Sequence, residues 1–374
     1  MGKILKKNNL MKQITVLMLA FCISFQISAK KYSFLIGTFT TNTPAKGIYS
    51  LSLNKKDLST NIQLLTEAVD PSFLCISTNK KFVYAVSERG EKSSVAAYKF
   101  IKNKKLQLIN KVNAGSLTDP CHIAMTDKHV VIANYSGGSV FVYSRNSNGS
   151  LSEVVQKIQH EGKSIHPSRQ TKPHTHQVVF SPDGKYLLAN DLGLDKVLVY
   201  KYNIANSNQP FTLFDTLDVK PGSGPRHLTF DKSGATIYLL QELDGTVSTI
   251  KYDNGKLTLM DTASVVRKNN IQTGAADIHL SPDGAFLYAT NRGSVNDITC
   301  FATSPIGKLT FVQQISTEGD GPRNFAISKD GKYVLVGNQR TNDICIFTRN
   351  KNTGKLTFTG KKVQVGAPVC ILEF

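Results

Sequence analysis

Short windows rich in histidine and arginine recur along this chain of 374 residues. Two of them read Thr175-His-Gln and Pro225-Arg-His. A guanidinium in a protein interior requires an anionic partner or ligand, because arginine keeps its charge. The histidines either act on that ligand or tie neighbouring repeats together through hydrogen bonds. We therefore expect a site for a small anion, and the residues of these windows that could serve it are His122, His174, His176, His227, Arg226 and Arg323.

The elements that carry these windows form a repeat. A polar turn lies between two short apolar runs after each of the first six windows, and its clearest copies read Ser181-Pro-Asp-Gly and Ser281-Pro-Asp-Gly. Because glycine adopts positive φ readily, each copy predicts a β-hairpin. A third apolar run and a turn such as Gly255-Lys-Leu then lead to a fourth strand. Four antiparallel strands, repeated every ~40 to 50 residues, are typical of a β-propeller.

The two ends of the chain complement each other. A seventh window, Pro368-Val-Cys, stands at the C-terminus with no hairpin after it, and the run that starts at Lys31 resembles the second strand of a hairpin whose first strand is missing. Pairing these two ends would close the ring and remove exposed sheet edges. We therefore predict an all-β, seven-bladed propeller with four antiparallel strands per blade, in which residues 30–374 form a single domain.

One face of this ring should carry the chemistry. In a four-stranded meander the start of the innermost strand and the end of the second strand lie on the same side, so the windows and the second-strand ends converge on one mouth of the central channel. The long connection from His160 to His176 also runs there, and its Arg169 and Gln170 either cover a ligand or belong to a solvated loop. The second-strand ends are Glu88-Arg89, Asn134-Tyr135, Asp191, Glu242, Asn291-Arg292 and Asn338.

Several ordered motifs resemble those of a known family. They include Asn134-Tyr-Ser-Gly-Gly-Ser-Val, Arg169-Gln-x-x-Pro-His-x-His, Gly224-Pro-Arg-His and Asn291-Arg-Gly. This combination resembles the lactonase-type seven-bladed propellers, which include 6-phosphogluconolactonases and carboxymuconate lactonizing enzymes, and the match runs from Gly37 to the C-terminus. The resemblance implies a catalytic centre of Glu242, Arg226, Arg292 and either His176 or His174. We expect substrate contacts from His122, Asn134, Arg169, Gln170, His227, Asn291, Arg323 and Asn338.

The reaction that the resemblance implies is hydrolysis of a small anionic sugar lactone. Glu242 or His176 would deprotonate the attacking water, and Arg226 and Arg292 would hold the oxyanion and the acidic group of the substrate. This scheme requires neither a metal nor another cofactor. The family's cytosolic sugar-phosphate lactonases lack an export signal, so whether the substrate of this chain is phosphorylated stays open.

Two other functions remain open at this point. The oxygen atoms of Glu88, Glu242, Asn134, Asn291 and Asn338 are ligands that Ca²⁺ accepts, so a metal-dependent sugar lactonase is one alternative. A non-catalytic, ligand-binding propeller of the cell envelope is the other. A nucleic-acid partner is not expected, because the basic residues are dispersed and the predicted mouth mixes acids with bases.

The N-terminus has the pattern of a signal peptide over residues 1–29. Four lysines precede an apolar run from Ile14 to Ile27, which ends at the small pair Ser28-Ala29. We therefore expect export to the periplasm or the medium, and we leave open whether Cys22 is lipidated. No run of ~18 apolar residues follows, so no transmembrane helix is expected after signal removal. The five remaining cysteines lack close pairs and are expected to be buried thiols.

Overall fold

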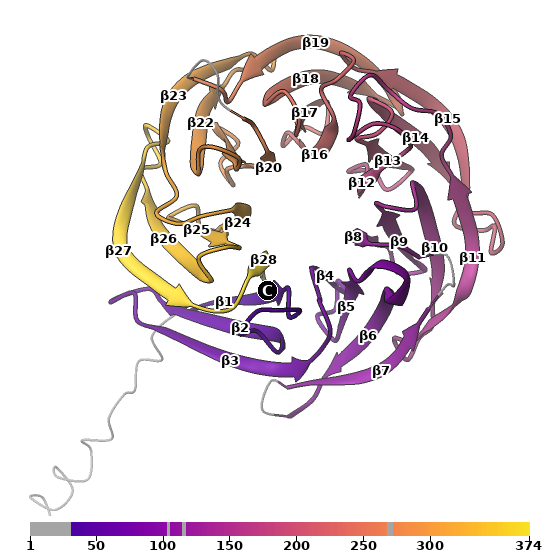
Figure 1. Ribbon diagram of the computed structural model, residues 1–374, viewed down its shortest axis with the longest axis horizontal. Helices are drawn as coiled ribbons and strands as arrows, with labels where there is room; N and C mark the ends of the chain where they lie inside the picture. The colour runs from indigo at the N-terminus through magenta and orange to yellow at the C-terminus, as the bar shows by residue number, and fades with distance from the viewer. Residues whose placement is uncertain (1–30, 103–104, 114–116, 268–271) are drawn as a thin grey trace, which may run out of the picture.

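The structure is a computed structural model, and it describes residues 31–102, 105–113, 117–267 and 272–374. The expected signal peptide, residues 1–29 with Cys22, lies outside the described residues. The described chain forms a ring of seven four-stranded antiparallel sheets around a central axis, with the innermost strand of each blade nearest to it (Figure 1). The predicted fold class is therefore confirmed. No helix among the described residues has the length and apolar character needed to cross a bilayer.

Each blade runs from an innermost strand at the channel to an outermost strand at the rim, and blades 1 to 7 follow the chain order. The innermost strands are β28 (Pro368–Glu373), β4 (Phe73–Ile76), β8 (Pro120–Met125), β12 (Thr175–Phe180), β16 (Pro225–Phe230), β20 (Ala275–Leu280) and β24 (Pro322–Ile327). The second strands are β1 (Lys31–Thr38), β5 (Phe82–Ser87), β9 (His129–Asn134), β13 (Tyr186–Asp191), β17 (Thr236–Gln241), β21 (Phe286–Asn291) and β25 (Tyr333–Asn338).

The outer two layers complete the blades, and one short 3₁₀ helix, η1 (Gly90–Lys92), follows β5. The third strands are β2 (Gly47–Asn54), β6 (Ser94–Phe100), β10 (Ser139–Arg145), β14 (Lys196–Tyr202), β18 (Thr246–Asp253), β22 (Asp297–Thr303) and β26 (Asp343–Arg349). The outermost strands are β3 (Thr60–Glu67), β7 (Leu106–Val112), β11 (Leu151–Gln159), β15 (Phe211–Asp218), β19 (Lys256–Ser264), β23 (Leu309–Ser316) and β27 (Leu356–Gln364).

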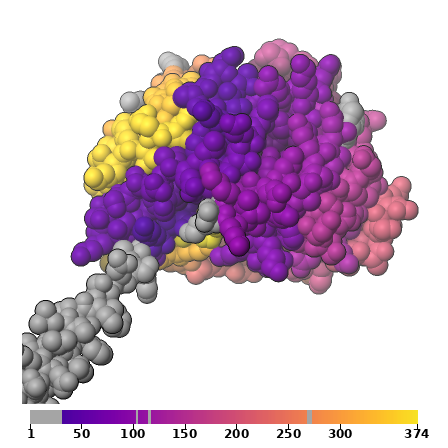
Figure 2. All heavy atoms as spheres, turned by 90° about the horizontal axis from the view of Figure 1, so that it is seen from below, coloured from indigo at the N-terminus to yellow at the C-terminus, as the bar shows by residue number. Residues whose placement is uncertain are grey.

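Blade 1 joins the two ends of the chain, as expected. Strand β28 pairs antiparallel with β1, from Phe34 opposite Glu373 to Thr38 opposite Pro368, and the sheet order is β28-β1-β2-β3. On the surface, the yellow C-terminal residues lie directly against the indigo N-terminal ones (Figure 2). Because the last strand occupies the inner edge of the first sheet, the ring has no open seam at this point.

The apolar core lies between neighbouring blades. For example, Phe286 and Tyr288 of blade 6 pack against Phe325 and Phe347 of blade 7. Similar clusters join the other blades, since strands that are apolar on both faces have a neighbouring sheet on each side. The five cysteines among the described residues are free thiols, and all but the partly buried Cys75 are buried. The prediction of buried thiols therefore holds for four of the five.

A β-bulge at the same place in several innermost strands orients the channel residues. In β16, Pro225 pairs with Gln241 and His227 pairs with Leu240, which leaves Arg226 without a partner residue. The second residues of β8, β12 and β24, namely Cys121, His176 and Arg323, are skipped in the same way. Bulges redirect side chains and often lie beside functional sites. As a result, the consecutive residues Arg226 and His227 both line one small cavity in the channel, which regular strand alternation would prevent.

Candidate active site

Three arginines converge on the carboxylate of Glu242. Arg226 Nη1 lies 2.5 Å from Oε2, Arg169 Nη2 lies 2.7 Å from Oε1, and Arg292 Nη2 lies 3.5 Å from Oε2. The side chains of Glu242 and Arg226 are 7% and 3% exposed, whereas that of Arg169 is 41% exposed. Three guanidinium groups against one carboxylate leave a surplus of positive charge, which suits an anion or an oxyanion.

The repeat explains why these side chains meet. Glu242 follows β17 directly, and its N–H donates to Gly224 O at 2.7 Å, beside the start of β16. Arg292 occupies the corresponding position after β21, where its N–H donates to Gly274 O at 3.1 Å. The bulge in β16 directs Arg226 into the channel between them, where its Nε also donates to Ala276 O at 2.6 Å.

His176 belongs to this cluster. Its Nε2 lies 2.5 Å from Arg226 Nη1 and 3.9 Å from Glu242 Oε2. Burial, together with the nearby positive charge of Arg226, holds the pKa of His176 well below its ordinary value of 6.5. The ring is therefore neutral, and Nε2 accepts the hydrogen bond from Arg226 because a guanidinium can only donate.

His174 lies apart from the carboxylate. Its half-buried ring stacks on Tyr135 with centroids 4.6 Å apart, and its Nδ1 lies 3.1 Å from Tyr135 O. The structure thus brings His176 to Glu242 and places His174, at the end of the long connection, against Tyr135. The sequence left these two histidines as alternatives, and the geometry favours His176.

The ionisation of Glu242 is set by its neighbours. Burial alone would raise the pKa of this carboxyl group, but the charges of Arg226, Arg292 and Arg169 outweigh burial and hold the pKa well below 4.5. Glu242 is therefore ionised throughout the physiological range. The same three arginines therefore also lower its basicity.

Other residues predicted at the mouth line the channel. Arg323 and His227 surround the same small cavity as His176 and Arg226. His227 Nδ1 lies 2.8 Å from Asp277 Oδ1, and Arg323 Nη2 lies 3.4 Å from Glu88 Oε1. His122 is buried beside them, with its ring centroid 5.6 Å from that of His227. Their role in substrate binding stays a prediction.

The predicted amide side chains instead bind the protein itself. The fully buried Asn134 accepts from Thr118 N at 2.7 Å, and Asn291 accepts from Gly274 N at 3.0 Å. Asn338 donates to Thr317 O at 3.2 Å, and the fully buried Gln170 donates to Leu192 O at 2.8 Å. These contacts fix the loops around the mouth, so the geometry favours a structural role over substrate contact. By contrast, Arg169 reaches the cluster and also donates to Tyr135 Oη at 3.2 Å.

Asp277 was not among the predicted site residues, although it holds several residues of the innermost strands together. Its carboxylate accepts hydrogen bonds from Asn324 at 2.6 Å and from Phe325 N at 3.2 Å, and lies 2.9 Å from His279 Nε2. One signal was available in the sequence, because Asp277 stands fifty residues after His227, at the same place in the repeat.

Most of the oxygen atoms proposed as ligands for a metal-dependent mechanism have other partners. Glu242 is paired with arginines, Glu88 Oε1 faces Arg323 Nη2, and the Oδ1 atoms of Asn134 and Asn291 accept loop backbone N–H groups. Within the described ranges, no three carboxylate, imidazole or thiol side chains gather in a way that could hold a metal ion. The donor set of this site therefore does not fit Ca²⁺, which prefers six to eight oxygen ligands.

The seven-bladed ring and its cluster of buried charged residues can now be compared with known proteins. The family model described as "Lactonase, 7-bladed beta-propeller" matches residues 33–373, and the chain belongs to this family. A 6-phosphogluconolactonase of Formosa agariphila is 36% identical over 332 residues, which cover 86% of this chain and 93% of that protein. The resemblance inferred from the sequence motifs is therefore confirmed.

Two further comparisons agree. A 6-phosphogluconolactonase of Bacillus subtilis is 34% identical over 355 residues, covering 91% of this chain and 98% of that protein. The solved structure of a periplasmic gluconolactonase of Pseudomonas aeruginosa has a TM-score of 0.88 and 34% identity, covering 92% of this chain and 99% of that one. The chain is thus similar along nearly its whole described length to proteins named for lactone hydrolysis.

Proposed function

We propose that the protein is a lactone hydrolase that opens a small sugar lactone with water, by general-base catalysis at Glu242 and His176. The observation that carries this proposal is the convergence of Arg226, Arg169 and Arg292 on the single carboxylate of Glu242, with neutral His176 beside it. The relatives named for gluconolactone and 6-phosphogluconolactone hydrolysis support it.

The geometry suggests how the reaction proceeds. A lactone carbonyl oxygen that enters the mouth competes for the N–H groups of Arg226 and Arg292, and these donors stabilise the oxyanion of the tetrahedral intermediate. As the arginines turn to the substrate, Glu242 and His176 lose part of their hydrogen bonding and become stronger bases. Either group can then take the proton of the attacking water. Collapse of the intermediate breaks the ring C–O bond, and the same group returns the proton to the departing ring oxygen.

The proposal is tested by measuring acid release from a panel of sugar lactones, with and without a phosphate group, by the mature protein before and after chelator treatment. Turnover that is unchanged by the chelator supports the proposed mechanism. Activity that is lost in chelator and restored by Ca²⁺ would favour the metal-dependent lactonase. If none of the lactones is hydrolysed, the non-catalytic binding propeller becomes the better account.

We expect kcat/KM to show no acid limb near pH 6.5. The basic form of a group is populated above its pKa, so the lowered pKa values of His176 and Glu242 move any loss of the base to lower pH. The pH profile of kcat/KM, which reports groups of the free enzyme, should stay flat through pH 6.5, with any acid limb at lower pH. An inflection close to 6.5 would indicate a base with an ordinary histidine pKa and would contradict this assignment.

Arg226→Lys should lower kcat/KM by about 100-fold, the effect typical of losing one oxyanion donor. An ammonium group cannot reproduce the guanidinium contacts to Glu242, His176 and Ala276 O at the same time. Arg340→Lys is a matched control, because Arg340 also pairs with a carboxylate, Asp320, but on the exposed surface. Steady-state kinetics of the two variants should separate them, and equal activity would argue against a role for Arg226 in the reaction.

We further propose that the protein is exported, on the basis of the signal-peptide pattern over residues 1–29. Similarity to a periplasmic gluconolactonase is consistent with this location. N-terminal sequencing of the protein from its native cells is expected to begin near Lys30. An intact chain that starts at Met1 or Met11 and stays in the cytoplasm would contradict export and would favour a phosphorylated lactone as substrate.

A further inference from the structure

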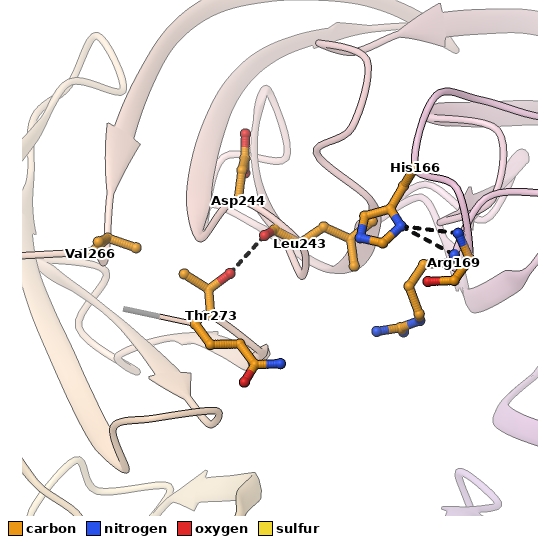
Figure 3. Close-up of a pocket in the computed structure, with 8 residues that line it drawn as sticks. His166, Arg169, Leu243, Asp244, Val266 and Thr273 are labelled. Carbon is orange, nitrogen blue, oxygen red and sulfur yellow. Dashed lines mark hydrogen bonds between the residues drawn. The ribbon is translucent and has the colours of Figure 1, made fainter. Parts of the chain in front are cut away.

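A cavity of about 530 Å³ opens beside the Glu242 cluster, over blade 5. Its described walls come from the connection before β12, the turn after β17, Val266 after β19 and residues 272–273 before β20, and most of these residues are drawn in Figure 3. Arg169 is common to both places, since it lines the cavity and donates to Glu242 Oε1 at 2.7 Å. The cavity therefore lies within one side chain of the Glu242 carboxylate.

The charged groups of this cavity already have partners. Arg169 is the sole lysine or arginine among the described lining residues, and Asp244 is the sole carboxylate among them. Asp244 accepts from Ser223 Oγ at 2.9 Å and lies 3.6 Å from Lys220 Nζ. A phosphate group would need free cationic donors. The lining residues that the structure describes carry one positive and one negative side chain, and this balance favours a neutral substituent.

The same walls offer groups that suit hydroxyls. His166 Nδ1 accepts the backbone N–H of Arg169 at 3.3 Å, so its other ring nitrogen carries the proton and can donate (Figure 3). The hydroxyl of Thr273 donates to Leu243 O at 2.7 Å and keeps its own oxygen as an acceptor. The exposed amide of Gln272 adds both a donor and an acceptor, and the Leu243 side chain provides an apolar surface. Polar groups beside an apolar surface match a sugar ring, which carries hydroxyls around C–H faces.

We propose that this cavity binds a second, neutral sugar unit of the substrate, so that the preferred substrate is an aldonolactone that carries a glycosyl substituent. This inference rests on the proposed lactonase function and specifies its substrate class. The lactone ring lies at Glu242 and Arg226, and the glycosyl unit lies between His166, Leu243, Asp244 and Gln272.

The test compares kcat/KM for maltobiono-1,5-lactone, glucono-1,5-lactone and 6-phosphoglucono-1,5-lactone. The disaccharide lactone is expected to be preferred over gluconolactone by about tenfold or more, because only it fills the cavity.

Gln272→Ala should lower this preference about fivefold through the loss of one hydrogen bond. Ser168→Trp, on the exposed part of the cavity wall, should abolish the preference by filling the space. Gln209→Ala, in the exposed connection after β14, is the control and should leave the ratio unchanged.

Three results would overturn the inference in distinguishable ways. If gluconolactone is hydrolysed as well as the disaccharide lactone and the variants do not alter the ratio, the cavity has no glycosyl site, while the lactonase function stands. If the 6-phosphate is preferred and Ser168→Trp removes that preference, the cavity binds phosphate instead. If none of the three lactones is hydrolysed, the proposed function fails, and the inference fails with it.

Discussion

Glu242→Gln is expected to lower kcat by about 100-fold or more, the loss typical of removing a general base. Glutamine keeps the size of the side chain but loses the negative charge on which Arg226, Arg169 and Arg292 converge. Because breaking a buried ion pair leaves uncompensated charge, the variant should also be destabilised, by about 3 kcal/mol. Steady-state kinetics and thermal unfolding of the same preparation measure both effects.

The control for this experiment is Glu153→Gln, which changes an exposed glutamate on the outermost strand of blade 3. This variant should retain the activity and the melting temperature of the parent. The Glu242→Gln protein should still show the circular dichroism of a β-propeller, because the ring is held by inter-blade packing away from the mouth. Full activity in a folded Glu242→Gln protein would remove Glu242 from the mechanism and leave His176 as the base.

A chain that ends at Gly366 is expected not to form the closed ring. The truncation removes β28, whose Val369, Cys370 and Ile371 are 2%, 3% and 6% exposed. At ~1.5 to 3 kcal/mol for each buried apolar side chain, the loss approaches the ~5 to 15 kcal/mol by which a protein of this kind is stable. It also exposes the edge of β1, which invites aggregation. Thermal unfolding and size-exclusion chromatography should show an unfolded or aggregated product.

Deletion of Phe374 alone is the matched control. This partly buried residue follows β28 and stacks on Phe100 with centroids 5.7 Å apart, so its loss should cost less than the loss of the whole strand and leave a cooperative transition. Supplying residues 367–374 as a peptide to the truncated chain should restore part of the folded signal. A truncation at Gly366 that melts cooperatively at the parent temperature would show that closure by β28 is not required.

The sequence by itself determined the repeat, the number of blades and the way the ring closes. These properties depend on local patterns, because Asp-Gly turns between apolar runs specify hairpins wherever they occur. The spacing of the repeat also placed Arg226, Glu242 and Arg292 at one mouth, since equivalent positions of successive blades lie on the same face. Membership of the lactonase family was recognisable from the motifs, which are likewise local.

Only the tertiary structure decided which of these side chains meet. The bulges in the innermost strands put Arg226 and His227 on one cavity, although strict alternation would separate consecutive residues. The distinction between His176 and His174 depends on such a bulge as well, because one extra residue changes the face to which a side chain points. The pairing of Arg169 with Glu242 arises from a connection 73 residues away in sequence, whose path no local pattern specifies. Local periodicity determines the elements and their faces, whereas register shifts and long-range contacts determine the chemistry of the site.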